Sequence, residues 1–303
     1  MPPPRTLAHQ FAHRLAESFL LAPGKRLFQA NQQNYNLPLS KLGKLQAGGY
    51  AILRDYADGL FPPTFDDQAR AYQAEISFYD AMAGASKQAN LDAHRRKPFW
   101  GTEAWSQYSR KFGRLLQSLQ SLGLAPGSRL LELGCGCGWM AEFLALSGYH
   151  VLGTTIMPDD VALGQERARA LQARHLTESL EFLVSPMESV HTAVSNRTPF
   201  DAVIVFEALH HAFDWRQSIS SAARCLKPAG WLLLANEPNT LHTFISYRIA
   251  KLSNTHEIGM SRKELTSHLS SCGLAEIRIL APRWDNRMSE HWIAARSPTT
   301  QRT

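Results

Sequence analysis

A glycine-rich stretch follows a short apolar run near the middle of the chain. The segment 129–156 reads RLLELGCGCGWMAEFLALSGYHVLGTTI, in which Gly134, Gly136 and Gly138 alternate with two cysteines. Glycine lacks a Cβ, so its backbone can approach a bound molecule where any other residue would clash. A bend of this kind between an apolar run and a helical pattern is typical of a ligand-binding loop.

Two kinds of site fit this stretch poorly. Cys135 and Cys137 form C-x-C, and no second cysteine pair or nearby histidine completes the four ligands of a zinc site. A nicotinamide dinucleotide site needs the order G-x-G-x-x-G, and Trp139 stands where the third glycine belongs. Glu132, two residues before the first glycine, would repel a pyrophosphate. A carboxylate there suits a ligand with a positively charged ammonium group.

Acidic and imidazole side chains gather after two later apolar runs. The run FEALHH places Glu207, His210 and His211 at its end, and the run ANEPN supplies Glu237. Histidine titrates near neutral pH and is a ready general base. We expect His211 to be the base, with His210 as the second candidate and Glu207 as an orienting member of the catalytic set. Either ring could instead cap a loop without taking part in chemistry.

Strands and helices alternate in the part of the chain that must position these side chains. Apolar runs typical of strands occupy 129–134, 150–156, 180–184, 200–209 and 230–238, and helical patterns occupy 138–148, 158–175 and 214–226. A helix near 261–272 begins with Ser261 and Glu264 in capping-box spacing. Two further strands follow, at 274–281 and 290–296. This order predicts an α/β fold with a doubly wound, mainly parallel sheet.

The N-terminal third reads as mainly helical. Leu7, Phe11, Leu15 and Phe19 lie four residues apart, which predicts a helix over 5–21, ended by Pro23 and Gly24. Such a stripe could lie on a membrane, but core packing is its commoner cause, and we expect it to face the core. Residues 23–63 show no sustained period, and helices are predicted over 65–84 and 102–122. We place a boundary near 97–101. The expected domains are a helical cap or substrate region, 1–100, and a second domain, 101–303.

Composition excludes several classes of protein. Apolar residues make up 44% and charged residues 19% of the 303 residues, as in a globular chain. No apolar run is long enough for a transmembrane segment, and the cysteines do not suggest a disulfide framework, so we expect a cytoplasmic protein. Residues 1–97 carry 12 Lys and Arg against 8 Asp and Glu, and 241–303 carry 9 against 5. These basic flanks favour an anionic acceptor. Without a Lys/Arg block or aromatic-interleaved basic run, nucleic-acid binding is not supported.

The three central motifs resemble those of the class I S-adenosylmethionine-dependent methyltransferases. The motifs are LLELGCGCGWM, FDAVIVFEALHHAFDW and CLKPAGWLLLANEP, and their order and spacing agree across about 105–296. The resemblance implies a Rossmann-like, seven-stranded sheet whose last strand is antiparallel, and S-adenosylmethionine as cofactor. An intervening insertion between the fifth and sixth strands, around His256, is expected to face the acceptor.

The resemblance also implies which residues bind. The cofactor would be held by residues of the first motif and of the two strand ends beside it: Glu132, Gly134, Cys135, Gly136, Gly138, Thr155, Ile156, Met187, Glu188 and Phe206. Thr155 stands where the family usually has an acid for the ribose, and Pro186 where it often has an Asp near the adenine. The acceptor would be contacted by Tyr108, Glu237 and His256. No fixed ligand spacing predicts a metal site.

We therefore expect a methyltransferase that methylates a hydroxyl oxygen of a small molecule, glycan or lipid-linked acceptor, and the basic flanks favour an anionic one. A lipid-acting or C/N-methylating relative is the alternative, because Thr155 also occurs in the lipid cyclopropane-forming branch of the family. From another class, a cofactor-binding pseudoenzyme that serves as a partner subunit stays open.

Overall fold

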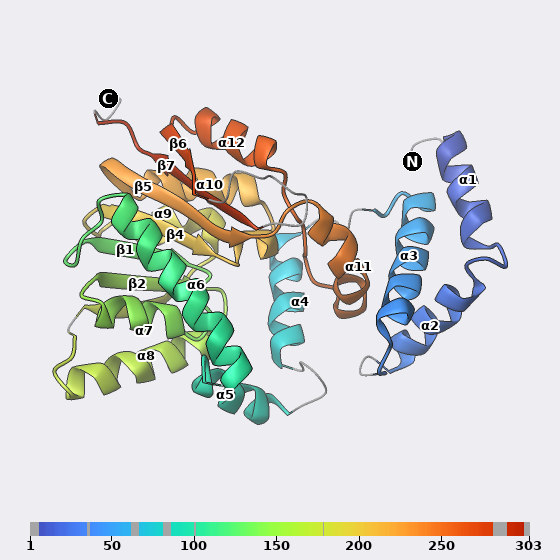
Figure 1. Cartoon of the computed structure of the whole chain (residues 1–303), viewed down its shortest axis with the longest axis horizontal. Helices are drawn as coiled ribbons and strands as arrows, with labels where there is room; N and C mark the ends of the chain where they lie inside the picture. The colour runs from blue at the N-terminus through green and yellow to red at the C-terminus, as the bar shows by residue number, and fades with distance from the viewer. Residues whose placement is uncertain are drawn as a thin grey trace. The chain divides into compact units, whose positions relative to one another are not determined.

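The computed structural model describes residues 6–34, 37–61, 67–80, 86–99, 101–177, 179–280 and 290–299. The chain divides into two compact units, 1–87 with 240–259, and 88–239 with 260–303. We call them the helical unit and the sheet unit (Figure 1). The sequence placed a single boundary at 100/101. In the structure most of helix α5 (Lys87–Arg96) lies in the sheet unit, and the segment 240–259 belongs to the helical unit.

Seven strands form one mixed sheet in the sheet unit. Its order is β3-β2-β1-β4-β5-β7-β6, with β7 antiparallel to both of its neighbours and the strands from β3 to β5 parallel. The predicted seven-stranded, doubly wound fold with an antiparallel last strand is confirmed. The strands are β1 (Arg129–Leu133), β2 (His150–Thr155), β3 (Leu180–Val184), β4 (Phe200–Phe206), β5 (Leu226–Glu237), β6 (Ala275–Ile279) and β7 (His291–Arg296).

Helices cover both faces of the sheet because successive strand residues point to opposite sides. Leu130 and Ile204 pack with α6 (Thr102–Ser121), α7 (Trp139–Leu146) and α8 (Pro158–Ala173). Their neighbours Leu131 and Val203 pack on the other face, with α9 (Val190–Ala193), α10 (Trp215–Arg224) and α12 (Arg262–Ser271). Both faces are therefore apolar, as expected of buried parallel strands.

Local signals set the ends of several helices. The Ser261 side chain accepts from the Glu264 amide, and the Glu264 side chain accepts from the Ser261 amide, so the predicted capping box of α12 is confirmed. Asp214 caps α10 by accepting from the amides of Arg216 and Gln217.

The helical unit corrects the sequence prediction in its first sixty residues. Its helices are α1 (Leu7–Ala16), α2 (Ala22–Gln33), α3 (Lys41–Ala57), α4 (Gln68–Asp80) and α11 (Leu241–Ser253). The predicted helix over 5–21 ends at Ala16, and residues 23–63, in which the sequence shows no sustained period, contain most of one helix and all of another. Pro23 and Gly24 begin α2 rather than ending α1. Proline is tolerated in the first turn because its missing N–H would have no intrahelical partner there. The ends of the predicted 65–84 helix lie outside the described residues.

The predicted core stripe of the first helix was wrong in orientation. Leu7 and Phe11 are 83% and 68% exposed, and Phe19, beyond the end of α1, is 84% exposed. The buried face of α1 instead consists of the small residues Ala12 and Ala16. Small side chains allow α1 to pack closely, while its large apolar side chains point to solvent.

A buried carboxylate joins three polar partners inside the helical unit. Asp55 of α3 accepts a hydrogen bond from the Tyr247 hydroxyl at 2.6 Å and pairs with Arg54 at 2.6 Å and Lys251 at 2.8 Å. Burial alone would raise the pKa of Asp55, but hydrogen bonds from Lys251, Tyr247 and Arg54 outweigh it and hold the pKa below its ordinary value. Tyr247 also packs in the apolar core with Phe28.

Replacing Asp55 tests this network. Asp55→Ala should lower the unfolding free energy of the helical unit by about 3 kcal/mol, because it leaves buried donors unpaired, whereas Tyr247→Phe should lower it by about 1 kcal/mol. Because the folded-state pKa of Asp55 is lowered, its contribution is present above its unfolded pKa of about 3.9 and is lost at lower pH. Urea unfolding followed by far-ultraviolet circular dichroism measures this. Equal midpoints for wild type and Asp55→Ala would contradict the network's role.

Candidate active site

The bend after β1 is held by its own backbone. The Cys135 amide donates to the Thr154 carbonyl at 2.9 Å, and the Gly138 amide donates to the Cys135 carbonyl at 3.0 Å. Gly134, Gly136 and Gly138 have φ values of +70°, +50° and +74°. These left-handed conformations favour glycine, and they turn the chain sharply from β1 into α7.

Two of the three glycines are also required by contacts within the protein. A Cβ on Gly138 would lie 2.4 Å from the Phe182 ring, and one on Gly134 would lie 2.4 Å from the Cβ of Ala208. The nearest atom to a Cβ on Gly136 is a carboxylate oxygen of Asp160 at 3.7 Å. From the sequence, we interpreted the glycines as making room for a ligand. Protein atoms fill the space beside Gly134 and Gly138, so this interpretation holds on steric grounds only for Gly136.

Glu132 is the charged side chain buried beside this bend. It lies on β1, and its Oε2 atom has no hydrogen-bond partner among the described residues. Burial raises the pKa of Glu132 to about 8, against the opposing effect of the Lys97 charge. A buried carboxyl oxygen without a donor is rare in folded proteins and suits a site that receives a positively charged group.

Helix α5 is tied to the bend by a set of polar contacts. Arg167 of α8 donates to the Cys137 carbonyl at 2.9 Å and to the Lys97 carbonyl at 2.7 Å, and it pairs with Glu142. His94 pairs with Asp160 at 2.9 Å. The end of α5 is thereby held near the loop and brings the charge of Lys97 toward Glu132.

Sequence reasoning missed the four residues of this attachment. The contacts of His94 with Asp160 and of Arg167 with the Lys97 carbonyl join residues 66 and 70 positions apart, so no local spacing could reveal them. The residues are His94, Lys97, Asp160 and Arg167.

The other predicted cofactor residues lie at the ends of neighbouring strands. Thr155 is buried at the end of β2, where its hydroxyl oxygen accepts from the Met157 amide at 3.4 Å, and Ile156 follows it. The Met187 methyl lies so near Gly134 that a Cβ there would approach it to 2.8 Å. One oxygen of the buried Glu188 accepts from the Asp214 amide at 3.0 Å. This hydrogen bond helps to anchor the N-terminus of α10, where Asp214 is the N-cap.

Two predicted contacts point into the core of the protein. The Cys135 thiol is buried, and a Cβ on Gly153 would lie 2.9 Å from its sulfur. The Phe206 ring packs edge-on against Trp292 with centroids 6.1 Å apart. For Cys135, the backbone is therefore the part that can meet a ligand. The cofactor roles of these residues stay predictions.

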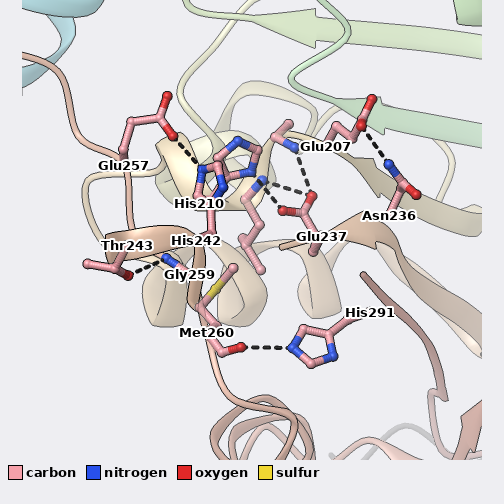
Figure 2. Close-up of polar contacts among 12 residues, drawn as sticks. Glu207, His210, Asn236, Glu237, His242, Thr243, Glu257, Gly259, Met260 and His291 are labelled. Atoms are coloured by element: carbon pink, nitrogen blue, oxygen red, sulfur yellow. Dashed lines mark hydrogen bonds and ion pairs between the residues drawn. The ribbon is translucent and has the colours of Figure 1, made fainter. Parts of the chain in front are cut away.

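A second buried carboxylate organises the ends of β4 and β5. Glu237 is fully buried and accepts from the amides of Ala208 at 2.8 Å and Leu209 at 3.0 Å, while its other oxygen lies 3.1 Å from Nδ1 of His210 (Figure 2). Burial raises the pKa of Glu237 to about 7, although the backbone hydrogen bonds act against it. Glu237 thus fixes the 3-10 turn Leu209–His211 that carries both histidines.

The two histidine rings lie against each other. Their centroids are 4.1 Å apart, with His210 buried and His211 half-buried. When Nδ1 of His210 donates its proton to Glu237, Nε2 is the nitrogen that can accept one. A carboxylate that orients an imidazole in this way is a common arrangement for a general base. The geometry therefore favours His210 more than the sequence did.

Glu207 is held in an unusual backbone conformation. Its φ is +48°, and that of Asn236, at the end of the adjacent strand, is +57°. Oε1 of Glu207 accepts from the Asn236 amide group and pairs with Lys111 of α6 (Figure 2 shows the Asn236 contact). Two non-glycine residues at positive φ side by side are the kind of strain that collects at functional sites. No pattern in the sequence indicated that Lys111 and Asn236 belong to the site.

The predicted acceptor residues are spread over the two units. Tyr108 of α6 packs edge-on against Trp139 at 5.0 Å, and Lys97 lies over its ring at 5.2 Å. Tyr108 and Glu237 therefore belong to the sheet unit. His256 is a buried residue of the helical unit, beyond the end of α11.

Comparison with known proteins identifies the domain. Residues 131–234 match the family model described as a methyltransferase domain. This match agrees with the seven-stranded sheet, with the glycine bend and with the resemblance of the central motifs to class I S-adenosylmethionine-dependent methyltransferases.

Similar proteins carry several activities. The chain is 28% identical over 121 residues to a ubiquinone biosynthesis O-methyltransferase of Xylella fastidiosa. The aligned region is 39% of this chain and 46% of that protein. It is 29% identical over 129 residues to an S-adenosyl-L-methionine-dependent Diels-Alderase of Talaromyces variabilis, 42% of this chain and 43% of that protein. The chain thus spans less than half the length of these relatives.

A solved structure shows the same fold. Magnesium protoporphyrin IX methyltransferase of Synechocystis, determined with bound SAH, covers 75% of this chain and 99% of its own, with 17% identity and a TM-score of 0.54. At this level of identity the likeness shows a shared fold.

Alanine substitutions at two glycines separate packing from ligand binding. Gly138→Ala should lower the melting temperature strongly. The new Cβ would clash with the Phe182 ring, and alanine would have to adopt the left-handed backbone conformation, so we expect a loss of about 2 kcal/mol or more in unfolding free energy. Gly136→Ala meets no close atom and should lower stability by only about 1 kcal/mol, from its backbone conformation. Thermal unfolding of the two variants measures the difference. A Gly136→Ala variant as unstable as Gly138→Ala would contradict this assignment.

Proposed function

We propose that this protein is a methyltransferase that transfers the methyl group of S-adenosylmethionine to a hydroxyl oxygen of a small molecule or glycan. The observation that carries the proposal is the buried Glu132, with an oxygen that no described residue satisfies, beside a glycine bend and the charge of Lys97. S-adenosylmethionine bears an amino-acid group whose ammonium suits Glu132 and whose carboxylate suits Lys97. The residues present therefore fit this cofactor.

Other residues would complete the cofactor site. The Gly136 backbone is open to a bound molecule, the Thr155 hydroxyl can accept or donate to ribose, and the Met187 side chain is placed to cover an apolar ring face. Glu188, whose carboxylate accepts from the Asp214 amide, lies next to Met187 in this group. When bound, S-adenosylmethionine supplies an electrophilic methyl carbon attached to a sulfonium.

The turn after β4 supplies the proton acceptor in this proposal. Bound S-adenosylmethionine would supply the methyl group, and the acceptor hydroxyl would have to give up its proton when its oxygen takes that group. Nε2 of His210 takes that proton, and Glu237, bonded to Nδ1, stabilises the imidazolium that results. His211, preferred from the sequence, lies against this ring and is the alternative base.

The acceptor would meet the polar residues at the rim of β4 and β5. Lys111, Glu207 and Asn236 offer an ammonium, a carboxylate and an amide within one hydrogen-bonded group. Such a group can orient an acceptor that carries hydroxyls and an acidic function. Similarity to O-methyltransferases supports oxygen as the methylated atom. The glycan, lipid-linked or anionic character of the acceptor rests on the basic flanks of the chain.

A second candidate function uses the cofactor without methyl transfer. Similarity to a protein named as a Diels-Alderase favours it. Incubation of a cell extract with the protein and S-adenosylmethionine labelled in its methyl group separates the two. Label transferred to an extract molecule supports the methyltransferase, whereas cofactor binding with no transfer supports the second candidate.

Proton release on cofactor binding tests the role of Glu132. With a pKa of about 8, Glu132 is mostly protonated at pH 7 in the free protein. An ammonium group beside it should lower that pKa and release close to one proton. Calorimetric titrations in phosphate and in Tris should therefore give binding enthalpies that differ by about the difference between the ionisation enthalpies of the two buffers.

Two matched variants sharpen this test. Glu132→Gln should abolish the buffer dependence and weaken binding by about tenfold or more. Glu237→Gln should keep the buffer dependence, because Glu237 faces His210 and the turn amides. A wild-type enthalpy that is independent of the buffer would contradict the assignment of Glu132.

Single histidine variants test the proton acceptor. His210→Ala should lower turnover by about a hundredfold or more, with cofactor affinity nearly unchanged, because general-base catalysis typically contributes this much. His211→Ala should have a smaller effect. Labelled-methyl turnover and cofactor titration on both variants measure this. A larger loss of turnover in His211→Ala than in His210→Ala would make His211 the general base. Near-normal turnover in both variants would show that neither histidine is the base.

A further inference from the structure

Large apolar side chains are exposed in succession at the start of the helical unit. Leu7 and Phe11 on α1 are 83% and 68% exposed, and Phe19 and Leu20 in the turn after it are 84% and 64% exposed. Single exposed apolar residues are ordinary on protein surfaces. Four large ones within fourteen consecutive residues are unusual, and they form what we call the α1 surface.

The orientation of α1 shows that this exposure is built into the helix. Its inner side carries Ala12 and Ala16, which are buried, and α1 lies along α3 within the helical unit (Figure 1). The Thr6 side chain caps the first turn by accepting from the His9 amide. A capped helix whose small residues face inward and whose large apolar residues face outward is ordered for contact with something apolar.

The part of the chain that carries the α1 surface has an excess of basic residues. Residues 6–47 contain five Lys and Arg and one acidic residue, Glu17. Glu17 is paired with Lys25 at 2.7 Å, so its charge is compensated. Arg14 lies seven residues, or about two helical turns, after Leu7 and so shares its face. The other basic residues of this part of the chain are Arg26, Lys41 and Lys44, all exposed.

We propose that the α1 surface attaches the protein to a membrane that contains anionic lipids. Leu7, Phe11, Phe19 and Leu20 enter the boundary between headgroups and acyl chains, and Arg14 and its basic neighbours meet the lipid phosphates. No helix among the described residues is long and apolar enough to cross a bilayer, so the attachment lies in the interface. A second copy of the chain fits this surface less well, because it would bring two sets of like charges together.

Vesicle sedimentation tests the proposal independently of any methyl transfer. The full chain should sediment with phosphatidylcholine vesicles that contain phosphatidylglycerol as roughly a third of the lipid, and much less with phosphatidylcholine alone. The double variant Phe11→Gln, Phe19→Gln should lower the partition coefficient by about tenfold or more, because it removes two buried aromatic side chains. Arg14→Glu and added salt should also weaken binding.

A matched control uses exposed leucines of the sheet unit. Leu146 and Leu176 are 47% and 45% exposed, and the double variant Leu146→Gln, Leu176→Gln should bind vesicles like the wild type. Circular dichroism verifies that both double variants are folded. Absence of binding to anionic vesicles, or equal loss in both double variants, would overturn the proposal. So would a dimer in analytical ultracentrifugation that Phe11→Gln, Phe19→Gln dissociates.

Discussion

The packing of Gly138 against the Phe182 ring constrains the sheet unit at the point where its site lies. Because a Cβ at this position would overlap the ring, the chain can turn from β1 into α7 only with glycine there. Glycine is required at position 134 for the same reason, because a Cβ there would overlap Ala208 at the start of the turn after β4. The bend is therefore pressed between β3 on one side and the turn after β4 on the other. Gly136, between them, is the part of the bend left open.

Two buried carboxyl groups at the ends of β1 and β5 share a raised pKa but have different surroundings. Glu237 is satisfied by two backbone amides and a histidine, and its position is fixed by them. One oxygen of Glu132 has no donor among the described residues, and Lys97, which directly follows α5, acts on Glu132 through its charge. The first arrangement orients a turn, and the second leaves a polar group to be satisfied by a ligand. This difference suits separate roles in proton transfer and in cofactor recognition.

The sequence predicted the sheet unit well because its signals are local. Apolar runs of strand length alternate with helical patterns, and glycines, Ser261 and Glu264 mark the turns and caps. The helical unit was predicted less well, because Pro23 and Gly24 are compatible with a helix start as well as a helix end. The stripe from Leu7 to Phe19 was assigned to a core since periodicity alone does not tell which face of a helix is buried.

The candidate site was predictable only where it consists of contiguous residues. The bend at 134–138 and the pair His210 and His211 are such segments, and the structure finds them at the ends of β1 and β4. The contacts of Lys111 with Glu207 and of His94 with Asp160 join residues 96 and 66 positions apart. They arise from the packing of α5 and α6 within the sheet unit, which no local pattern encodes.

Equilibrium dialysis of the full chain with labelled S-adenosylmethionine tests the central claim, that the bend and Glu132 form the site of this nucleoside. The account predicts saturable binding at one site per chain, displaced by S-adenosylhomocysteine and unaffected by an excess of NAD. Absence of saturable binding at millimolar nucleoside, or displacement by NAD, would contradict it.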